Sequence, residues 1–387
     1  MPMKRLSFGF LILFTLCFTG SYATPQDRAI SLSDRLQADL ERIHAAGKFP
    51  GATASVVLED GTAHDLAVGV SDRSAGHRMK PSDRMLLGSV GKTFVSAVAL
   101  QLVQEKRLDL DARISAHLGG EPWFERLPNA EDITIRMVMN HTSGVPRYVF
   151  KKAFIRQVTG RPCRTWQPED LVGFVLGDRA PFEAGKGWAY SDTNYILLGM
   201  IIERVTESKL YTQIASRLLK PHGLRDTIPS DRRSLPGLVN GYPGSGDPLG
   251  LKGSTLVNGK FLINPQFEWA GGGYATTSRD LAHWARTLFE GRAFSRSLMK
   301  PFLAGVKARL GPGTRYGLGV MIHKTDLGDV YGHGGFFPGY RTEMRYYARH
   351  RFALAVQFNT SDQRMIGASP GAVAHRLARV VAAHPAR

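Results

Sequence analysis

Ser89 and Lys92 stand three residues apart at the start of the apolar segment SVGKTFVSAVALQLVQ, residues 89 to 104. Positions i and i+3 of a helix share one face, so a helix over about residues 93–105 would place the amine beside the hydroxyl. A lysine removed from water loses its proton more easily and could then act as the base for a serine nucleophile. Unpaired N–H groups at the helix start would favour negative charge on the serine oxygen. The pair therefore predicts nucleophilic chemistry at Ser89.

Two other interpretations fit the same residues. The letters GSVGKT resemble a shortened phosphate-binding loop, but such a loop requires a glycine where this chain has Leu86. A serine that only caps a helix, with its lysine at the surface, would show the same spacing. The spacing also occurs at Ser297 and Lys300, just before Pro301. The pair alone is weak evidence, and residues elsewhere in the chain have to support it.

Two further segments carry residues suited to the same site. Tyr190 and Asp192 stand in a polar turn directly before an apolar segment, residues 194–206, so the phenol could point toward a substrate. His333 and the two glycines that follow it are expected at the end of a strand, where missing side chains let a substrate approach the backbone. His141, in NHTSG, is expected to satisfy backbone groups in a turn. These segments support the prediction that Ser89 is a nucleophile.

With these segments in this order, residues 31 to about 380 resemble the superfamily of serine β-lactamases and D,D-peptidases. The similar branch contains class C β-lactamases, D-aminopeptidases, D,D-carboxypeptidases and esterases. The family carries Ser-x-x-Lys, then Tyr-x-Asn, then Lys- or His-x-Gly, which fall here at Ser89, Tyr190 and His333. The stretches ITIRMVMNHTSGVP and GGGYATTSRDLAHWARTLFEG also look like family segments. The resemblance implies a serine hydrolase of the β-lactamase and D,D-peptidase fold.

The resemblance also implies a role for each motif. Ser89 would attack a carbonyl to form an acyl-enzyme, with Lys92 and Tyr190 sharing the acid and base work. The backbone N–H groups of Ser89 and Phe336 would bind the oxyanion. Water would release the acyl group, so neither a metal nor a cofactor is expected. The substrate-binding residues would be Asp192, His333, Gly334, Gly335 and Arg341.

The chain departs from the family pattern at two of these positions. Asp192 stands where the family usually has asparagine, and an ionised carboxylate accepts hydrogen bonds but cannot donate them. Asp192 is expected to pair with Lys92, which would raise the pKa of the lysine and shift the base role toward Tyr190, or to bind a cationic substrate group. Gly334 replaces a hydroxyl residue that many relatives use to hold a carboxylate. Arg341 could replace it as a carboxylate partner or could be an ordinary surface arginine.

The pattern of the whole chain predicts an α+β fold with one antiparallel sheet. An amphipathic helix is expected over 31–46, and strands are expected at both ends of the chain, among them one over 316–323. Helix signals dominate from about residue 93 to 292, with one helix expected over 278–289. We expect a single domain over residues 24–387, with a sheet lobe at about 31–85 and 312–385 and a helical lobe at about 93–292. A cleft between the lobes is the expected site. The glycine- and proline-rich stretch 236–259 is expected to be a long surface loop, either bordering the site or irrelevant to it.

The first residues predict export. Lys4 and Arg5 precede an apolar run and small residues, which is typical of a signal peptide cleaved after Ala23, so a periplasmic or secreted protein is expected. Cys17 would leave with the signal, and Cys163 would remain alone. The formal net charge of +17 favours anionic cell-envelope surfaces or only solubility, and no nucleic-acid motif accompanies it. After signal removal no membrane segment is expected.

The sequence therefore predicts an exported serine hydrolase that cleaves an amide or ester of a small or peptide-like substrate through Ser89. Two alternatives stay open. One is a D-alanyl-D-alanine carboxypeptidase or weak β-lactamase. The other is a binding protein on the same fold, impaired by Asp192, that captures penicillin-like or acyl ligands without turnover.

Overall fold

The computed structural model describes residues 1–3 and 30–384 of the 387-residue chain. The apolar run of the predicted signal peptide, Cys17 and the cleavage position after Ala23 lie outside the described residues. The unit that begins at Leu32 contains all the helices and strands described below.

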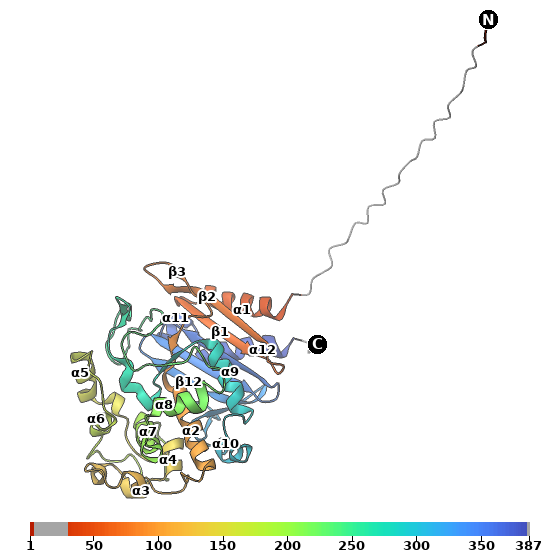
Figure 1. Cartoon of the computed structure of the whole chain (residues 1–387). Coiled ribbons are helices and arrows are strands. Elements are labelled where there is room, and N and C mark those ends of the chain that lie inside the picture. The colour runs from red at the N-terminus through yellow and green to blue at the C-terminus, as the bar shows by residue number, and fades with distance from the viewer. Residues whose placement is uncertain (4–29, 385–387) are drawn as a thin grey trace. The chain divides into compact units, whose positions relative to one another are not determined.

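A nine-stranded antiparallel sheet forms the centre of this unit (Figure 1). Strand β1 from the start of the chain pairs with β14 from its end, so Ala52 lies opposite Phe358. The predicted sheet built from both ends of the chain is therefore confirmed. The strands, in spatial order, are β3 (His77–Arg78), β2 (Ala63–Asp72), β1 (Gly51–Val57), β14 (Phe352–Phe358), β13 (Tyr340–Tyr347), β12 (Gly328–Phe337), β11 (Met321–Thr325), β10 (Arg315–Tyr316) and β9 (Val306–Lys307).

Two terminal helices cover one face of the sheet. Alternate residues of β1 and β14, among them Val56 and Leu354, pack against α1 (Leu32–Ala46) and α12 (Pro370–Ala382) in one hydrophobic core. This follows from the two-residue period of a strand, which sends every second side chain to the same face. The apolar spacing in α1 and its helical extent were both predicted from the sequence.

The helical part of the chain covers the opposite face. Helix α9 (Ser278–Phe289) lies against β1 and β14, and Ser278 Oγ lies 2.7 Å from Thr53 Oγ1. Helix α2 (Lys92–Gln104) is buried on nearly all sides, and it packs against α7 (Asp192–Thr206). The other helices of this part are α3 (Ser115–Leu118), α4 (Ile135–Asn140), α5 (Lys152–Gly160), α6 (Pro168–Gly173), α8 (Leu210–Ile214) and α10 (Met299–Leu303), and the short α11 (Gln363–Ile366) precedes α12.

Small sheets complete the fold. Strands β4 (Met85–Leu86), β8 (Tyr274–Thr276) and β5 (Ile228–Pro229) form one sheet, and β6 (Leu256–Val257) pairs with β7 (Lys260–Phe261). The stretch 236–259 contains no helix, as expected.

The prediction of one strand over 316–323 is wrong in part. The chain turns at Gly317, whose N–H donates to the carbonyl of Val320, and Gly319 has a φ of +91°. These glycines separate β10 from β11, so one predicted strand is two.

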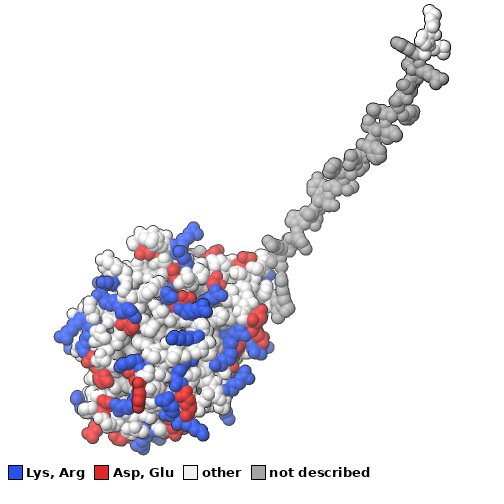
Figure 2. Space-filling view, viewed as in Figure 1, with Lys and Arg blue, Asp and Glu red and all other residues white. Residues whose placement is uncertain are grey.

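Basic and acidic side chains are mixed over the face shown in Figure 2, with Lys and Arg in the majority. Within the described residues, no helix has the length and apolar character required to cross a membrane.

Candidate active site

Ser89 lies in a single 3₁₀ turn, η1 (Gly88–Gly91), and the α-helix starts only at Lys92. The turn is held between two backbone segments by close glycine contacts. A Cβ at Gly91 would lie 1.9 Å from the carbonyl oxygen of Gly272, and a Cβ at Gly335 would lie 1.9 Å from that of Leu87. No side chain fits at either position, so the sequence requires glycine there. These contacts fix the position of Ser89 against β12 and against the segment before β8.

The ammonium group of Lys92 is the centre of a buried network. Its side chain is 0% exposed, and Nζ donates to Ser89 Oγ at 3.0 Å, to Asp192 Oδ1 at 2.9 Å and to the carbonyl oxygen of Gly271 at 2.5 Å. Three acceptors thus satisfy the three N–H donors of an ammonium. The structure thus brings Ser89, Lys92 and Asp192 together as predicted.

The ion pair determines the charge state of the lysine. Burial alone would lower the pKa of Lys92, but the neighbouring carboxylate of Asp192 outweighs it, and the pKa of Lys92 is raised. Burial would likewise raise the pKa of Asp192, yet the Lys92 and Arg147 cations hold it well below its usual range. At neutral pH the pair is an ammonium and a carboxylate. In this state Lys92 cannot accept the proton of Ser89.

Arg147 is the second cation on Asp192. Its Nε and Nη2 donate to Asp192 Oδ2 at 3.0 and 2.8 Å. Its guanidinium carbon lies 4.3 Å from the centre of the Phe150 ring and 5.1 Å from that of Tyr190. The side chain is 33% exposed, whereas that of Asp192 is 10% exposed. Arg147 therefore connects the buried network to solvent.

The loop from Asn140 to Pro146 positions the segment that carries Tyr190. The N–H of Ala189 donates to the carbonyl of His141 at 3.1 Å, and the N–H of Ser191 reaches His141 Nδ1 at 3.3 Å. His141 is fully buried and has a φ of +65° just after α4, so it serves backbone groups in a turn, as predicted.

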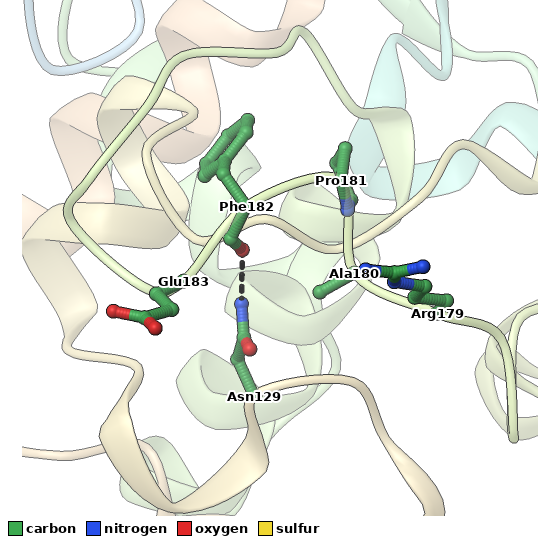
Figure 3. A pocket seen from close by; sticks show the side chains of 6 residues that line it. All are labelled: Asn129, Arg179, Ala180, Pro181, Phe182 and Glu183. Atoms are coloured by element: carbon green, nitrogen blue, oxygen red, sulfur yellow. Dashed lines mark hydrogen bonds between the residues drawn. The ribbon is translucent and has the colours of Figure 1, made fainter.

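Asn129 ties the same loop to the start of that segment. Its side-chain nitrogen donates to the carbonyl oxygens of Ser143 and Phe182, both at 2.9 Å. Figure 3 shows the bond to Phe182 beside a surface hollow lined by Arg179 and Glu183, among others. None of the residues that line this hollow belongs to the network around Ser89, and we assign it a supporting position only.

Tyr190 lies beside Ser89 and Lys92 in the extended segment before α7. Lys92 Nζ lies 5.1 Å from the centre of its ring. Its hydroxyl is buried and forms no hydrogen bond with standard geometry among the described residues. Burial raises the pKa of Tyr190, and the charge of Lys92 opposes this rise. The phenol is thus protonated at neutral pH, and the ammonium is the group that stabilises its phenolate.

His333 is 1% exposed and contacts protein rather than solvent. Its Nδ1 lies 2.6 Å from the carbonyl oxygen of Gly334, so Nδ1 carries the proton and Nε2 accepts from the Tyr316 hydroxyl at 2.9 Å. Burial lowers the pKa of His333 to about 3, so the imidazole is neutral. Its role in substrate binding stays a prediction.

The end of β12 lies beside the nucleophile. Strand β11 pairs with β12 only as far as Gly332, so the strand from His333 onward has no β11 neighbour, and η1 packs there. A Cβ at Gly88 would lie 2.7 Å from the backbone nitrogen of Phe336, which brings this predicted oxyanion donor close to the turn of Ser89.

The other predicted substrate residues lie further along this strand and its neighbour. A Cβ at Gly334 would meet Glu343 Oε2 at 3.1 Å rather than the Ser89 turn. Arg341 is paired across the strands with Phe336, and both line a hollow of about 330 Å³ with Arg364 and Asp362. Their roles in binding stay predictions.

Four residues of the site were missed from the sequence: Arg147, Glu268, Gly271 and Tyr316. Glu268 is 9% exposed, and its Oε2 has no hydrogen-bond partner within the described part of the chain. Burial, opposed by the charge of Lys92, raises the pKa of Glu268 to about 8. Of the four, only Gly271 lies inside one of the family-like segments, and Arg147 directly follows another. Nothing in the spacing of Glu268 or Tyr316 distinguishes them.

Known proteins are similar to this sequence over most of its length. The sequence model of the Beta-lactamase family matches residues 36–375. The chain is 24% identical over 343 residues to penicillin-binding protein 4* of Bacillus subtilis (strain 168), covering 84% of this chain and 72% of the relative. It is 28% identical over 255 residues to protein flp of Staphylococcus aureus (strain MW2), covering 65% of this chain and 47% of that relative.

Solved structures agree with the sequence matches. A D-stereospecific amidohydrolase from Streptomyces sp. superposes with a TM-score of 0.74 at 29% identity, covering 85% of this chain and 97% of that one. A D-amino acid amidase from Ochrobactrum anthropi SV3, complexed with L-phenylalanine amide, gives a TM-score of 0.77 at 23% identity, covering 91% of this chain and 98% of that one. The predicted fold is confirmed.

Proposed function

This chain belongs to the Beta-lactamase family and is a serine hydrolase, and we propose that it cleaves an ester or an amide through an acyl-enzyme on Ser89. The observation that carries the proposal is the 3.0 Å hydrogen bond from Lys92 Nζ to Ser89 Oγ inside a buried ion-paired network. A serine that only capped a helix would not lie on a buried ammonium. No hydroxyl of a phosphate-binding loop would do so either.

The charge states favour Tyr190 as the base. In the reactive fraction of molecules the Tyr190 phenol has first released its proton to water, and Lys92 stabilises the resulting phenolate. The bond from Ser89 Oγ to the carbonyl carbon then forms as the Oγ proton passes to this phenolate. Tyr190 then gives this proton to the leaving oxygen or nitrogen as the scissile bond breaks. Water attacks the acyl-enzyme by the same steps in reverse. Backbone N–H groups of Ser89 and Phe336 would bind the oxyanion, and each is worth about 10²-fold to 10³-fold in rate.

The test is labelling and turnover of the full chain. A fluorophosphonate probe should label the protein, and p-nitrophenyl acetate should be hydrolysed. Ser89→Ala should lose the label and about 10³-fold or more of the turnover, because a catalytic unit fails when one member is removed. Ser297→Ala is the matched control, since the exposed Ser297 has the same spacing to Lys300 and should keep both activities. Equal turnover by Ser89→Ala and the parent would refute the nucleophile.

A second candidate function is ligand capture without turnover. The raised pKa values of Lys92 and Tyr190 support it, because both groups hold their protons at neutral pH. A fluorescent penicillin would then label the chain with one equivalent while no ester is turned over. A chromogenic cephalosporin, a D-alanyl-D-alanine peptide and a D-amino acid amide, screened side by side, would separate weak β-lactamase, carboxypeptidase and amidase activities.

We further propose that the chain is exported and cleaved after Ala23. The charges at Lys4 and Arg5 and the apolar run behind them support this proposal. Its basic surface would then meet anionic envelope components (Figure 2). Sequencing the amino terminus of the protein recovered from the periplasm or medium tests the cleavage, and an intact Met1 would contradict it.

A further inference from the structure

Arg147 is the member of the buried network that reaches solvent. Lys92 is 0% exposed and Asp192 10%, while Arg147 is 33% exposed. Both nitrogens that Arg147 uses, Nε and Nη2, bind the same carboxylate oxygen of Asp192. Its third nitrogen, Nη1, has no partner within residues 30–384. The edge of the guanidinium formed by Nε and Nη2 is therefore fixed on Asp192, and the donors of Nη1 are free to bind another group.

The position of Arg147 is fixed close to the reacting groups. Its guanidinium lies 5.1 Å from the centre of the Tyr190 ring, and Lys92 Nζ lies at the same distance from that ring. It also lies 4.3 Å from the centre of the exposed Phe150 ring. Contacts with two rings and two hydrogen bonds to one carboxylate hold the side chain in place before any substrate arrives, which reduces the cost of ordering it on binding.

The network carries a net positive charge. Lys92 and Arg147 contribute two positive charges and Asp192 one negative charge, which leaves 2 − 1 = +1. His141 and His333 are buried and neutral, because burial keeps the pKa of each below its usual value. Glu268 is protonated at neutral pH, because burial raises its pKa to about 8. Within residues 30–384, no carboxylate other than Asp192 forms an ion pair with Lys92 or Arg147.

We propose that Arg147 determines acyl specificity, and that the preferred substrate carries a carboxylate on its acyl group. This inference rests on the proposed function, because it names the substrate class of the same Ser89 site. Asp192 removes the donor that an asparagine would offer to an acyl group, and at the same time it anchors an arginine that offers stronger, charged donors. The same charge disfavours substrates with an ammonium group near the scissile carbonyl.

Two esters with one leaving group test the proposal. Mono-p-nitrophenyl adipate carries a carboxylate at the far end of its acyl chain. The p-nitrophenyl ester of adipamic acid, the monoamide, has nearly the same shape without the charge. The parent should favour the adipate by about tenfold in kcat/KM, the size expected of a charged hydrogen bond. Added salt should reduce this preference only weakly, because the site is partly buried.

Variants then assign the preference to Arg147. Arg147→Gln should bring the ratio of the two kcat/KM values to about one, and Arg147→Lys should keep part of the preference. Arg156→Gln, which removes an exposed arginine from α5, controls for net charge and should leave the ratio as in the parent. A merely structural role of Arg147 would lower both rates together and leave the ratio unchanged.

The outcomes separate the two proposals. If the parent hydrolyses neither ester, or if Ser89→Ala hydrolyses both as well as the parent does, the proposed function is wrong. If the parent hydrolyses both esters equally, or if Arg147→Gln keeps the full preference for the adipate, the hydrolase stands and the role of Arg147 is refuted.

Discussion

At the scale of single residues, Asp192 has the largest effect on the chemistry. It contacts both Lys92 and Arg147, so one carboxylate sets the charge of the lysine and the position of the arginine. Its negative charge keeps Lys92 protonated and also raises the pKa of Tyr190. Replacing it with an amide would remove both influences while keeping nearly the same shape.

Asp192→Asn should therefore make the phenolate of Tyr190 easier to form. The rising limb of kcat/KM against pH should move to lower pH, because removing a nearby negative charge lowers the pKa of Tyr190. The melting temperature should fall, because Lys92 and Arg147 lose their carboxylate. A pH series with p-nitrophenyl acetate and a thermal melt measure these effects. An unchanged pH profile would show that Tyr190 does not act as the base.

The sequence predicted the residues that carry side-chain chemistry better than those that support them. Ser89, Lys92 and Asp192 were placed together from motif order, and the structure brings them together. Arg147 and Glu268 were missed, because no motif fixes their spacing from Ser89. Their positions depend on loops whose course the local sequence does not specify.

At the scale of elements, close backbone contacts place the nucleophile. The turn η1 fits between β12 and the segment at Gly272 because Gly88, Gly91 and Gly335 leave room for neighbouring carbonyl groups. Long predicted elements, such as α1 and α9, were correct nearly to the residue, since their apolar period extends over several turns. Short α4 and α6 were missed, because six residues do not display a period.

Gly91→Ala should displace the Ser89 turn. The new Cβ would lie 1.9 Å from the carbonyl oxygen of Gly272, so one of the two backbones has to move. A misplacement of about 1 Å costs about 10²-fold in rate, and kcat/KM for an ester should fall by at least that factor. Gly160→Ala, where nothing lies within 4 Å of the new Cβ, should leave activity unchanged. Full activity in Gly91→Ala would mean that the turn tolerates movement.

At the scale of the whole molecule, buried titratable groups make stability depend on pH in opposite directions. The pKa of His333 is lowered by burial, so the unfolded chain binds its proton more tightly and stability is lost as pH falls below 6.5. The pKa of Glu268 is raised from 4.5 to about 8, so the folded chain binds its proton more tightly. The stability from Glu268 is complete below pH 4.5 and is lost as pH rises toward 8.

Of these two groups, only Glu268 still changes the free energy of unfolding between pH 6.5 and 8. The free energy of unfolding should fall by about 2 kcal/mol across this window, at about 1.4 kcal/mol per pH unit. In Glu268→Gln, which mimics the neutral acid, this slope should disappear. Urea unfolding at several pH values measures it, and His77→Gln at an exposed strand end is the control. The same slope in the parent and in Glu268→Gln would contradict a protonated Glu268.

The pairing of β1 with β14 has a consequence for synthesis of the chain. Because β1 ends at Val57 and β14 begins at Phe352, a ribosome must translate residues 58–351 before β1 can gain this neighbour. A nascent or prematurely terminated chain would leave β1 with an unpaired edge, the kind of surface that promotes aggregation. In such a chain Ser89 would also lack the complete sheet, whose strand β12 packs against its turn. Hydrolytic activity is therefore expected only after the strands of the sheet have all been synthesised.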